Sequence, residues 1–328
     1  MSTAFLNVLS KHPSKITKDE ALSLYNGMPE NYKKEVTQDS FVNYFSQPGK
    51  RENIFWHDYE AGGTNAMKTQ PLQFASIRTD LDHNVIDVLL DLYCKPAGDK
   101  LPHPVAIALT KISPLHCEEK GLPEPLFFRN INAEMSAPGS CTTGHNSMGY
   151  DETITRFGFW RNFIPVYKRE FLNGNSRWDT LGLLAVFSAL DIPGINWPKR
   201  EDDQSLRSLK LENFAKSNGI TQDNAHNAVD DVKAMIDVSK FLKEKSKSLW
   251  EYLYKNRTKK EVSSIIAKEK VGILVSPFFG GKKNFHSPVM LLGQVPGDKN
   301  KWAYIELSDI EQLKRCQSLT VDELKTQL

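Results

Sequence analysis

The sequence predicts an α/β domain with a mixed sheet, followed by a small all-β module. Three strand-like segments come first, and helices mixed with a further strand follow, which is the order of a mixed sheet covered by helices. Near residue 246 the pattern changes to a Lys-rich helix and then to short strands separated by Gly, Pro and Asp-rich turns. That second pattern is typical of a compact β structure.

Length and composition are those of an ordinary globular protein. The chain has 328 residues, enough for two domains or for one large domain with an appendage. Its residues are 40% hydrophobic and 25% charged, and no run of 18 apolar residues predicts a membrane span. The net charge of +2 neither demands nor excludes a polyanionic partner.

The N-terminus has neither the basic nor the apolar region of a secretory signal. The four cysteines are scattered, which predicts neither a disulfide framework nor a zinc site: Cys94, Cys117, Cys141 and Cys316. We therefore expect a cytoplasmic protein with no membrane partner.

Residues 1–50 predict a small helical extension of unknown role. Thr17 and Glu20 have the spacing of a capping box, and an apolar helix pattern follows them. A second helix is expected over about 31–45, and the Pro-Gly pair at its end indicates a linker.

Residues 51–248 predict the α/β domain. The segments NIFWHDYE, LQFASIRTD and VIDVLLDLYCKP are expected to form an antiparallel meander, and HPVAIALTKISP a short helix. A short strand or loop comes next, then a helix from about Asp151. RWDTLGLLAVFSAL is expected to be a buried helix, because its apolar residues recur at helical spacing. The last helix of this domain has an apolar stripe, and Asn224 can cap it.

Residues 249–328 predict a linker helix and then a β module. GILVSPFFGG, SPVMLLGQV and KWAYIEL are the expected strands. The C-terminal segment from residue 308 is polar and predicted to be helical.

The stretch HDYEAGG carries two carboxylates directly behind an apolar run. In a strand, Asp58 and Glu60 point to the same face. Like charges that close raise each other's pKa, and a divalent cation is the usual agent that offsets their repulsion. An isolated pair of this kind is also common at a solvated strand end. Other residues of the chain are therefore needed to distinguish a metal site from a solvated strand end.

Two further acidic clusters follow. Asp151 stands at an expected helix start, five residues after Asn146. His226 and Asp231 open another helix; residues five apart lie about 140° apart around the helix axis, so His226 is expected in the loop or cap and Asp231 one turn in. Both side chains can then face the same sheet edge.

The order D-x-E, N-x₄-D, H-x₄-D resembles the DEDDh 3′→5′ exonucleases, the proofreading superfamily. The segments HDYEAGGTNAMKTQPLQFASIRTD, YCKPAGDKLPHP, NSRWDTLGL, GINWP and KSNGITQDNAHNAVDDV resemble bacterial exonuclease I, a nuclease specific for single-stranded DNA. The resemblance covers about 54–254 well and 270–310 more loosely. It implies a ribonuclease H-like mixed sheet flanked by helices and a small SH3-like β module. Residues 1–50 have no counterpart, and the helical C-terminal domain of that family is expected to be absent.

The resemblance implies five catalytic residues: Asp58, Glu60, Asp151, His226 and Asp231. Two Mg²⁺ ions, for which Mn²⁺ can substitute, would serve both ends of an in-line displacement. By resemblance, Asp58, Glu60 and Asp231 hold one ion, Asp58 bridges to the second, and Asp151 reaches it directly or through water. His226 is the implied general base, and the near-neutral pKa of an imidazole suits that role.

The resemblance also implies contacts with the substrate strand by five residues: Glu60, Arg156, Tyr167, Phe171 and Lys210. Cations along the backbone and aromatic faces for the bases are what a single strand requires. The neighbours Phe159, Trp160 and Phe163 are expected in the core.

Several other polar residues are expected to have no catalytic role. We expect His145 to pack or hydrogen-bond locally, and His57 to face the opposite side of its strand. Asp230 is expected to be solvated, and the Lys-rich runs 243–247 and 255–260 to be solvated helix faces rather than a strand path.

The resemblance implies a 3′→5′ exonuclease that releases 5′-mononucleotides from single-stranded DNA, in DNA repair or recombination. The alternatives are the same chemistry on single-stranded RNA, and a non-catalytic strand-binding protein on the same fold. Only a contact with the 2′-hydroxyl separates DNA from RNA substrates, and motifs do not show one. The expected partners are single-stranded DNA and, by resemblance, a single-strand DNA-binding protein; a monomer is expected.

Overall fold

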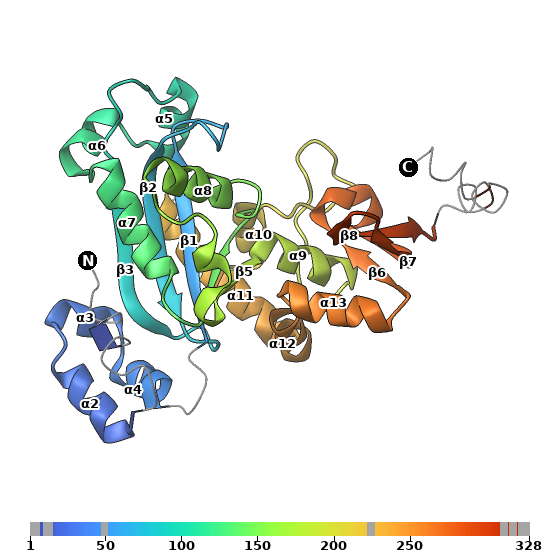
Figure 1. Cartoon of the computed structure of the whole chain (residues 1–328), viewed down its shortest axis with the longest axis horizontal. Helices are drawn as coiled ribbons and strands as arrows, with labels where there is room; N and C mark the ends of the chain where they lie inside the picture. The colour runs from blue at the N-terminus through green and yellow to red at the C-terminus, as the bar shows by residue number, and fades with distance from the viewer. Residues whose placement is uncertain are drawn as a thin grey trace.

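The computed structural model describes residues 16–46, 52–221 and 227–308, together with the isolated residues 7, 8, 314 and 320. Within them, a five-stranded sheet and a separate three-stranded sheet organise the chain (Figure 1). None of the helices in these residues is long and apolar enough to cross a membrane.

The larger sheet is mixed, as the sequence predicts. Its strand order is β3-β2-β1-β4-β5. The bounds are β1 Asn53–Ala61, β2 Pro71–Thr79, β3 Val85–Tyr93, β4 Ser140–Gly144 and β5 Ser176–Asp179. The first three strands form the expected antiparallel meander, whereas β4 runs parallel to β1 and β5 parallel to β4. The carboxyl ends of β1, β4 and β5 therefore meet at one edge of the sheet.

Strand β1 is buried on both faces, which explains its continuous apolar run. Ile54 and Trp56 pack in one hydrophobic cluster, and Phe55 and Tyr59 pack in another. Because side chains alternate across a strand, Asp58 continues the face of Ile54 and Trp56. The face that carries Asp58 and Glu60 thus changes from core to site at the end of the strand, whereas the other face stays in the core through Tyr59 and Ala61.

Helices cover both faces of the sheet. The cluster that contains Trp56 also contains residues of α9 Thr180–Ala189, α10 Leu211–Ser217, α11 Ala228–Lys245 and α12 Lys247–Lys255. The cluster that contains Phe55 also contains residues of α7 Glu124–Met135 and α8 Asp151–Arg161. Two short helices, α5 Pro104–Thr110 and α6 Pro114–Lys120, lie between β3 and α7 in the chain.

The N-terminal helices pack against the edge strand β3. They are α2 Lys18–Asn26, α3 Glu30–Glu35 and α4 Gln38–Ser46, and Figure 1 shows them beside β3. The predicted capping box of Thr17 and Glu20 is confirmed. The single helix expected over 31–45 is wrong: Val36 is extended, and the Thr37 hydroxyl accepts a hydrogen bond from the Ser40 N–H at 3.2 Å, so a new helix starts there.

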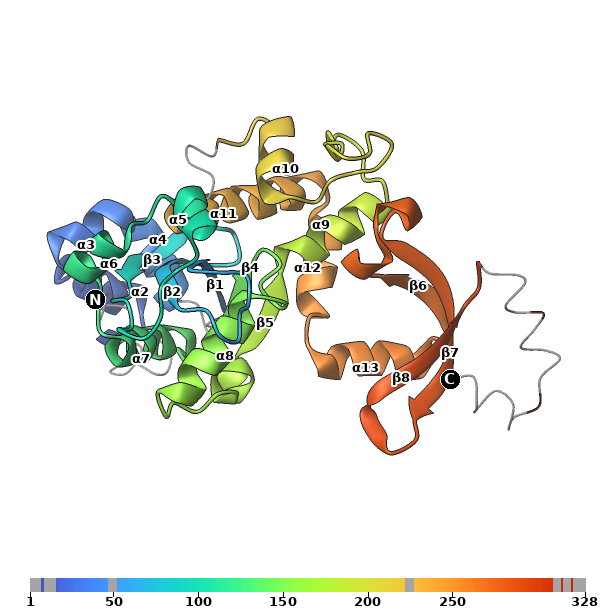
Figure 2. The same ribbon diagram turned by 90° about the horizontal axis from the view of Figure 1, so that it is seen from above.

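The smaller sheet is antiparallel, with the order β6-β7-β8. Its strands are β6 Val271–Val275, β7 His286–Val295 and β8 Asp298–Glu306, preceded by α13 Lys259–Lys268. Figure 2 shows it at the opposite end of the molecule from α2 to α4. Asn284 anchors it to the end of α9, because its side chain hydrogen-bonds the Ser188 hydroxyl at 2.8 Å and the Ser188 carbonyl at 3.0 Å. The division of the chain at residues 50 and 248 stays a prediction.

The predicted buried helix over RWDTLGLLAVFSAL is wrong at its start. Its first residues form strand β5, and helix α9 begins only at Thr180. The reason is Asp179, whose backbone is extended and whose carboxylate accepts a hydrogen bond from the Leu181 N–H at 2.9 Å as an N-cap.

Candidate active site

Three carboxylates meet at the carboxyl end of β1. Asp58 and Glu60 come from the strand, and Asp231 comes from the first turn of α11, which packs on β1 and β2. One ligand oxygen from each of the three residues lies within 4.8 Å of the others. Residues that are more than 170 positions apart in the sequence are thus brought to one point.

The start of α11 determines where Asp231 points. Asn227, not Asn224, is the N-cap, and its side chain accepts from the N–H groups of Val229 at 3.1 Å and Asp230 at 3.4 Å. The prediction of an Asn224 cap is therefore wrong. The predicted general base, His226, lies outside the described residues, so its role stays a prediction.

Asp151 lies beside strand β1, next to the two strand carboxylates. It is the first residue of α8, it is 4% exposed, and its carboxylate accepts a hydrogen bond from the Tyr59 N–H at 3.2 Å. Tyr59 lies between Asp58 and Glu60 in β1. The backbone of the D-x-E strand thus holds Asp151 beside the two strand carboxylates.

The carboxylates of the site repel one another. Burial raises the pKa of Asp58, and the charges of Asp151, Asp231 and Glu60 add to that effect. Burial, together with Asp231 and Asp151, raises the pKa of Glu60 to about 8. Burial also raises the pKa of Asp151 to about 8. A divalent cation offsets such repulsion, and an all-oxygen donor set suits a hard cation such as Mg²⁺ or Mn²⁺.

The loop between β4 and α8 leads directly into Asp151. Asn146 in this loop has a left-handed backbone, with φ 58°. The Asp179 carboxylate accepts hydrogen bonds from the N–H groups of Asn146 at 2.9 Å and Met148 at 3.1 Å. The sequence reasoning missed Asp179; the signal available was its place as a possible N-cap directly before an apolar helix.

A buried ion network lies under the first turn of α8. Glu152 is 1% exposed and contacts Arg169 at 2.6 Å and Arg177 at 3.3 Å. Burial alone raises the pKa of Glu152, but the two guanidinium groups outweigh it and lower the pKa. The sequence reasoning also missed this network, because residues 17 and 25 positions apart carry no local signal.

The residues predicted to contact substrate lie on and after α8. Arg156 makes two hydrogen bonds of 2.9 Å with Glu170, and its guanidinium lies 5.2 Å from the ring centre of Tyr167. Two of its five N–H donors are used by Glu170, which leaves three for a phosphate. Tyr167 is 59% and Phe171 is 62% exposed. Their contacts with substrate stay predictions.

The expectation that all three neighbouring aromatic residues are core is wrong for two of them. Phe159 is fully buried, but Trp160 is 71% and Phe163 is 99% exposed. The helix presents one face to the sheet, and Trp160, the next residue along, faces away from it. Phe163 lies beyond the end of α8, with a left-handed backbone.

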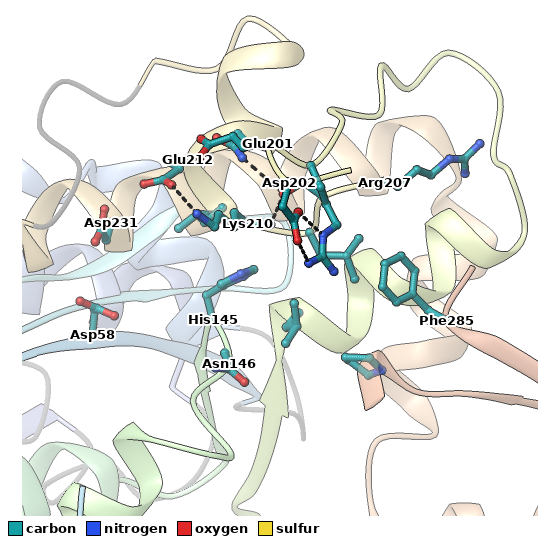
Figure 3. Close-up of a pocket in the computed structure, with 17 residues that line it drawn as sticks. Asp58, His145, Asn146, Glu201, Asp202, Arg207, Lys210, Glu212, Asp231 and Phe285 are labelled. Atoms are coloured by element: carbon teal, nitrogen blue, oxygen red, sulfur yellow. Dashed lines mark hydrogen bonds and ion pairs between the residues drawn. The ribbon is translucent and has the colours of Figure 1, made fainter. Parts of the chain in front are cut away.

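A cleft of about 880 Å³ extends from the carboxylates toward the smaller sheet. Asp58 and Asp231 lie at one end of it and Phe285 at the other (Figure 3). Lys210 lies between them; its side chain is 63% exposed and is 3.8 Å from Glu212. The predicted substrate contact of Lys210 stays a prediction, but the residue lines the cleft that leads from the site.

The expectations for the two histidines agree with the structure. His145 is paired locally, through its Nδ1 and the Thr180 hydroxyl at 3.0 Å. His57 is fully buried on the opposite face of β1, where its ring stacks on Phe74.

Two charged residues that were expected to be solvated are partly covered, whereas Glu244, Lys245 and Lys247 of the run 243–247 are exposed as expected. Asp230 is half-buried and lies 4.0 Å from Lys233. Lys243 is 13% exposed: it donates to the Leu81 carbonyl at 2.7 Å and pairs with Asp82 at 2.7 Å. The long lysine side chain bridges α11 to the turn between β2 and β3, a contact that a charge run in the sequence does not reveal.

The chain is similar to exonucleases both in a family model and in the sequences of individual proteins. The exonuclease family model RNase_T matches residues 55–239. Exodeoxyribonuclease I of Haemophilus influenzae is 40% identical over 279 residues, covering 84% of this chain and 58% of that protein. The Escherichia coli exodeoxyribonuclease I is 38% identical with the same coverage, and that of Buchnera aphidicola subsp. Acyrthosiphon pisum is 37% identical over 84% of this chain and 67% of its own.

Solved structures of exonuclease I are similar to the same extent. Escherichia coli exonuclease I in complex with a dA16 oligonucleotide has a TM-score of 0.77 and 36% identity, covering 84% of this chain and 59% of that one. An ExoI/SSB-Ct complex has a TM-score of 0.76 and 35% identity, with the same coverage. The chain spans slightly less than three fifths of the length of most of these relatives.

Proposed function

Because this chain belongs to the RNase_T exonuclease family, we propose that it hydrolyses single-stranded DNA from the 3′ end and releases 5′-mononucleotides. The observation that carries the proposal is the convergence of Asp58, Glu60 and Asp231 to within 4.8 Å, with Asp151 held against the same strand. The setting we propose is DNA repair or recombination.

The substrate class rests on the similar proteins and on the surface around the site. The exonuclease I relatives include one in complex with dA16, and exposed Tyr167 and Phe171 offer faces on which bases can stack. Arg156 and Lys210 supply positive charge for the backbone, and we propose that Glu60 also contacts the terminal nucleotide. A single-strand DNA-binding protein is a proposed partner, since an ExoI/SSB-Ct complex is among the similar structures.

We propose two Mg²⁺ ions as the cofactor, with Mn²⁺ able to substitute. Asp58, Glu60 and Asp231 would hold one ion; Asp58 and Asp151 would hold the other. When bound, such ions stabilise charge on the attacking and departing oxygens of an in-line displacement. The donor set supports this cofactor: three carboxylates converge, a fourth is held against the same strand, and an all-oxygen set suits a hard divalent cation.

Each side chain then has a defined role. His226 takes a proton from the attacking water, which adds to the phosphorus, and the 3′ oxygen of the preceding nucleotide departs. The Tyr59 N–H keeps the Asp151 carboxylate in place through its hydrogen bond. The products are a 5′-mononucleotide and a strand one nucleotide shorter.

The first test removes single carboxylates. Glu60→Gln and Asp231→Asn should each reduce the rate of shortening of a 5′-labelled DNA strand by about 100-fold or more, because each removes a group that acts in the transition state. Strand binding, measured separately by fluorescence anisotropy, should change far less. EDTA should stop the reaction of the unmodified protein.

Asp230→Asn is the matched control, since Asp230 is the adjacent carboxylate on α11 but is not one of the three that converge. It should retain most of the activity. Near-normal activity of Glu60→Gln or Asp231→Asn would remove that residue from the proposed site, and inactivity of the unmodified chain with Mg²⁺ would favour a strand-binding role.

The second test compares DNA and RNA oligomers of the same sequence under one condition. We expect faster release of nucleotides from DNA. A higher rate on RNA would replace the proposed substrate with single-stranded RNA.

A further inference from the structure

One side chain next to the site, Asp179, accepts several hydrogen bonds but belongs to neither the D-x-E strand nor α11. Asp179 ends β5, and its carboxylate accepts three backbone N–H bonds. One comes from Leu181 at 2.9 Å, within its own helix; the other two come from Asn146 at 2.9 Å and Met148 at 3.1 Å, in the loop before Asp151. Burial raises the pKa of this carboxylate, and the N–H groups of Met148, Leu181 and Asn146, together with the nearby Ser147 hydroxyl, act to lower it.

We propose that Asp179 is a positioning residue that holds the Asp151 carboxylate at the metal site by fixing the loop 145–150. This inference rests on the proposed function of the site. Asp179 itself touches neither metal nor substrate in this scheme; it acts through Asp151.

Helix capping alone does not account for these contacts. A capping aspartate needs to accept from the N–H of one or two residues in its own first turn. Asp179 does so with Leu181, yet two of its three backbone bonds cross to a loop more than 30 residues earlier. The first of these two bonds satisfies the N–H of Asn146. The backbone of Asn146 is left-handed, with φ 58°, which is costly for a residue with a side chain.

The next residue, Thr180, ties down the beginning of the same loop. Its hydroxyl donates to the Gly144 carbonyl at 3.0 Å and lies 3.0 Å from His145 Nδ1. Gly144 is packed so closely that an added Cβ would lie 2.7 Å from the Ser147 Cβ. The segment from Gly144 to Met148 is therefore fixed to the junction of β5 and α9.

The fixed loop leads directly to the site. The Ser147 carbonyl accepts from the Glu152 N–H at 2.9 Å, which joins the loop to the first turn of α8. Asp151 is the first residue of that helix, and its carboxylate accepts from the Tyr59 N–H at 3.2 Å. A shift of the loop would therefore move Asp151 relative to Asp58. Groups that orient metal ligands in this way typically change metal affinity by about 10- to 100-fold when they are removed.

The test measures Mn²⁺ binding by electron paramagnetic resonance of the metal-free protein, with saturating thymidine 5′-monophosphate present. Asp179→Asn keeps the size of the side chain but replaces one acceptor oxygen with an amide. We expect its Mn²⁺ dissociation constant to rise about 10-fold. Ser147→Ala is a milder change that should raise the same constant by a smaller factor, and it keeps the test valid if Asp179→Asn does not fold.

The matched control is Asp80→Asn. Asp80 is also a half-buried aspartate, and its carboxylate accepts from the N–H groups of Asp82 and Asn84, each at 2.9 Å, in the turn between β2 and β3. Its replacement should lower the unfolding temperature without changing the Mn²⁺ dissociation constant by more than twofold.

A double-mutant cycle separates positioning from general destabilisation. If Asp179 acts through Asp151, Asp179→Asn should have no further effect on Mn²⁺ binding in an Asp151→Asn background. Additive effects, or unchanged Mn²⁺ affinity in both Asp179→Asn and Ser147→Ala, would overturn the inference. If the unmodified protein binds Mn²⁺ no better than Asp58→Asn does, the proposed metal site itself fails, and the inference with it.

Discussion

At the scale of single residues, the site is defined by carboxylates that are held close together, and their mutual repulsion lowers the stability of the folded state. Asp58 and Glu60 are adjacent on one face of β1, and Asp231 lies opposite them. A folded protein keeps such a cluster only where the rest of the fold compensates for the repulsion, or where a cation does so. The loss of stability should therefore be measurable as a lower free energy of unfolding in the metal-free protein.

We predict that the metal-free protein loses stability as the pH rises from 6.5 to 8. The pKa of Glu60 is raised to about 8 in the folded state, so in this range the folded state binds more protons than the unfolded state. The free energy of unfolding then falls with rising pH, by up to about 1.4 kcal/mol per pH unit for each such group. Buried histidines such as His57, with a pKa lowered to about 4, have the opposite effect but act below pH 6.5.

Urea unfolding in EDTA at several pH values measures this effect. Glu60→Gln should flatten the decline, whereas Asp230→Asn should leave it in place. An equal decline in Glu60→Gln and the unmodified protein would show that Glu60 does not carry the effect.

The sequence identified the carboxylates of the site but not the residues that support them. The motif order that resembles the DEDDh exonucleases singled out Asp58, Glu60, Asp151 and Asp231; the structure brings Asp58, Glu60 and Asp231 together, and their catalytic role stays a prediction. Asp179 and Glu152 were missed, since their partners lie in segments that only the folded sheet brings near.

At the scale of elements, the carboxyl ends of β1, β4 and β5 explain where the site lies. Loops leave parallel strands at the same edge, so the D-x-E residues, the loop before Asp151 and Asp179 are gathered there. Strand β3 is one of the two outer strands of this sheet, and the N-terminal helices cover it. The Tyr32 hydroxyl donates to the Ile86 carbonyl, and Glu35 accepts from the Leu89 N–H, each at 2.7 Å.

We predict that Tyr32→Phe lowers the free energy of unfolding by about 1–2 kcal/mol, because it leaves a buried edge carbonyl without its partner. Urea unfolding checks this value. Tyr252→Phe is the control, since Tyr252 is 53% exposed and its loss of a hydroxyl should cost little. Equal stability of the two variants would mean that the Tyr32 bond does not hold the helices on β3.

The boundaries of elements were harder to predict than their existence. The sequence analysis joined β5 to α9 and α3 to α4, although polar residues stand at both boundaries. In both places a capping side chain, Asp179 or Thr37, ends one element and starts the next. Capping residues of this kind are common outside helices, so they seldom decide a boundary from sequence alone.

At the scale of the whole molecule, the cleft joins the two sheets. Asp58 and Asp231 at one end belong to the large sheet and its helix, and Phe285 at the other end precedes β7 of the small sheet. In the proposed function, a single DNA strand whose 3′ end reaches the carboxylates can continue along this cleft, past Lys210.

We predict that Lys210→Ala weakens binding of single-stranded DNA and reduces its salt dependence. Loss of one phosphate contact on a single strand should lower the slope of log K against log salt by about 0.7. Lys216→Ala is the control, because Lys216 is an exposed lysine on α10, the helix that Lys210 directly precedes, and it is not among the residues lining the cleft. Equal salt slopes for the two variants would exclude Lys210 from the strand path.

The sequence by itself determined the class of fold, because strand alternation and helix spacing are local rules, and its motifs indicated the family and four candidate carboxylates through their resemblance to the DEDDh exonucleases. The tertiary structure alone decided that three of these carboxylates share one point, that Trp160 faces outward, and that Asp179 holds the loop before Asp151. The physical reason is that such contacts join segments far apart in the chain, and their geometry depends on how the sheet brings those segments together.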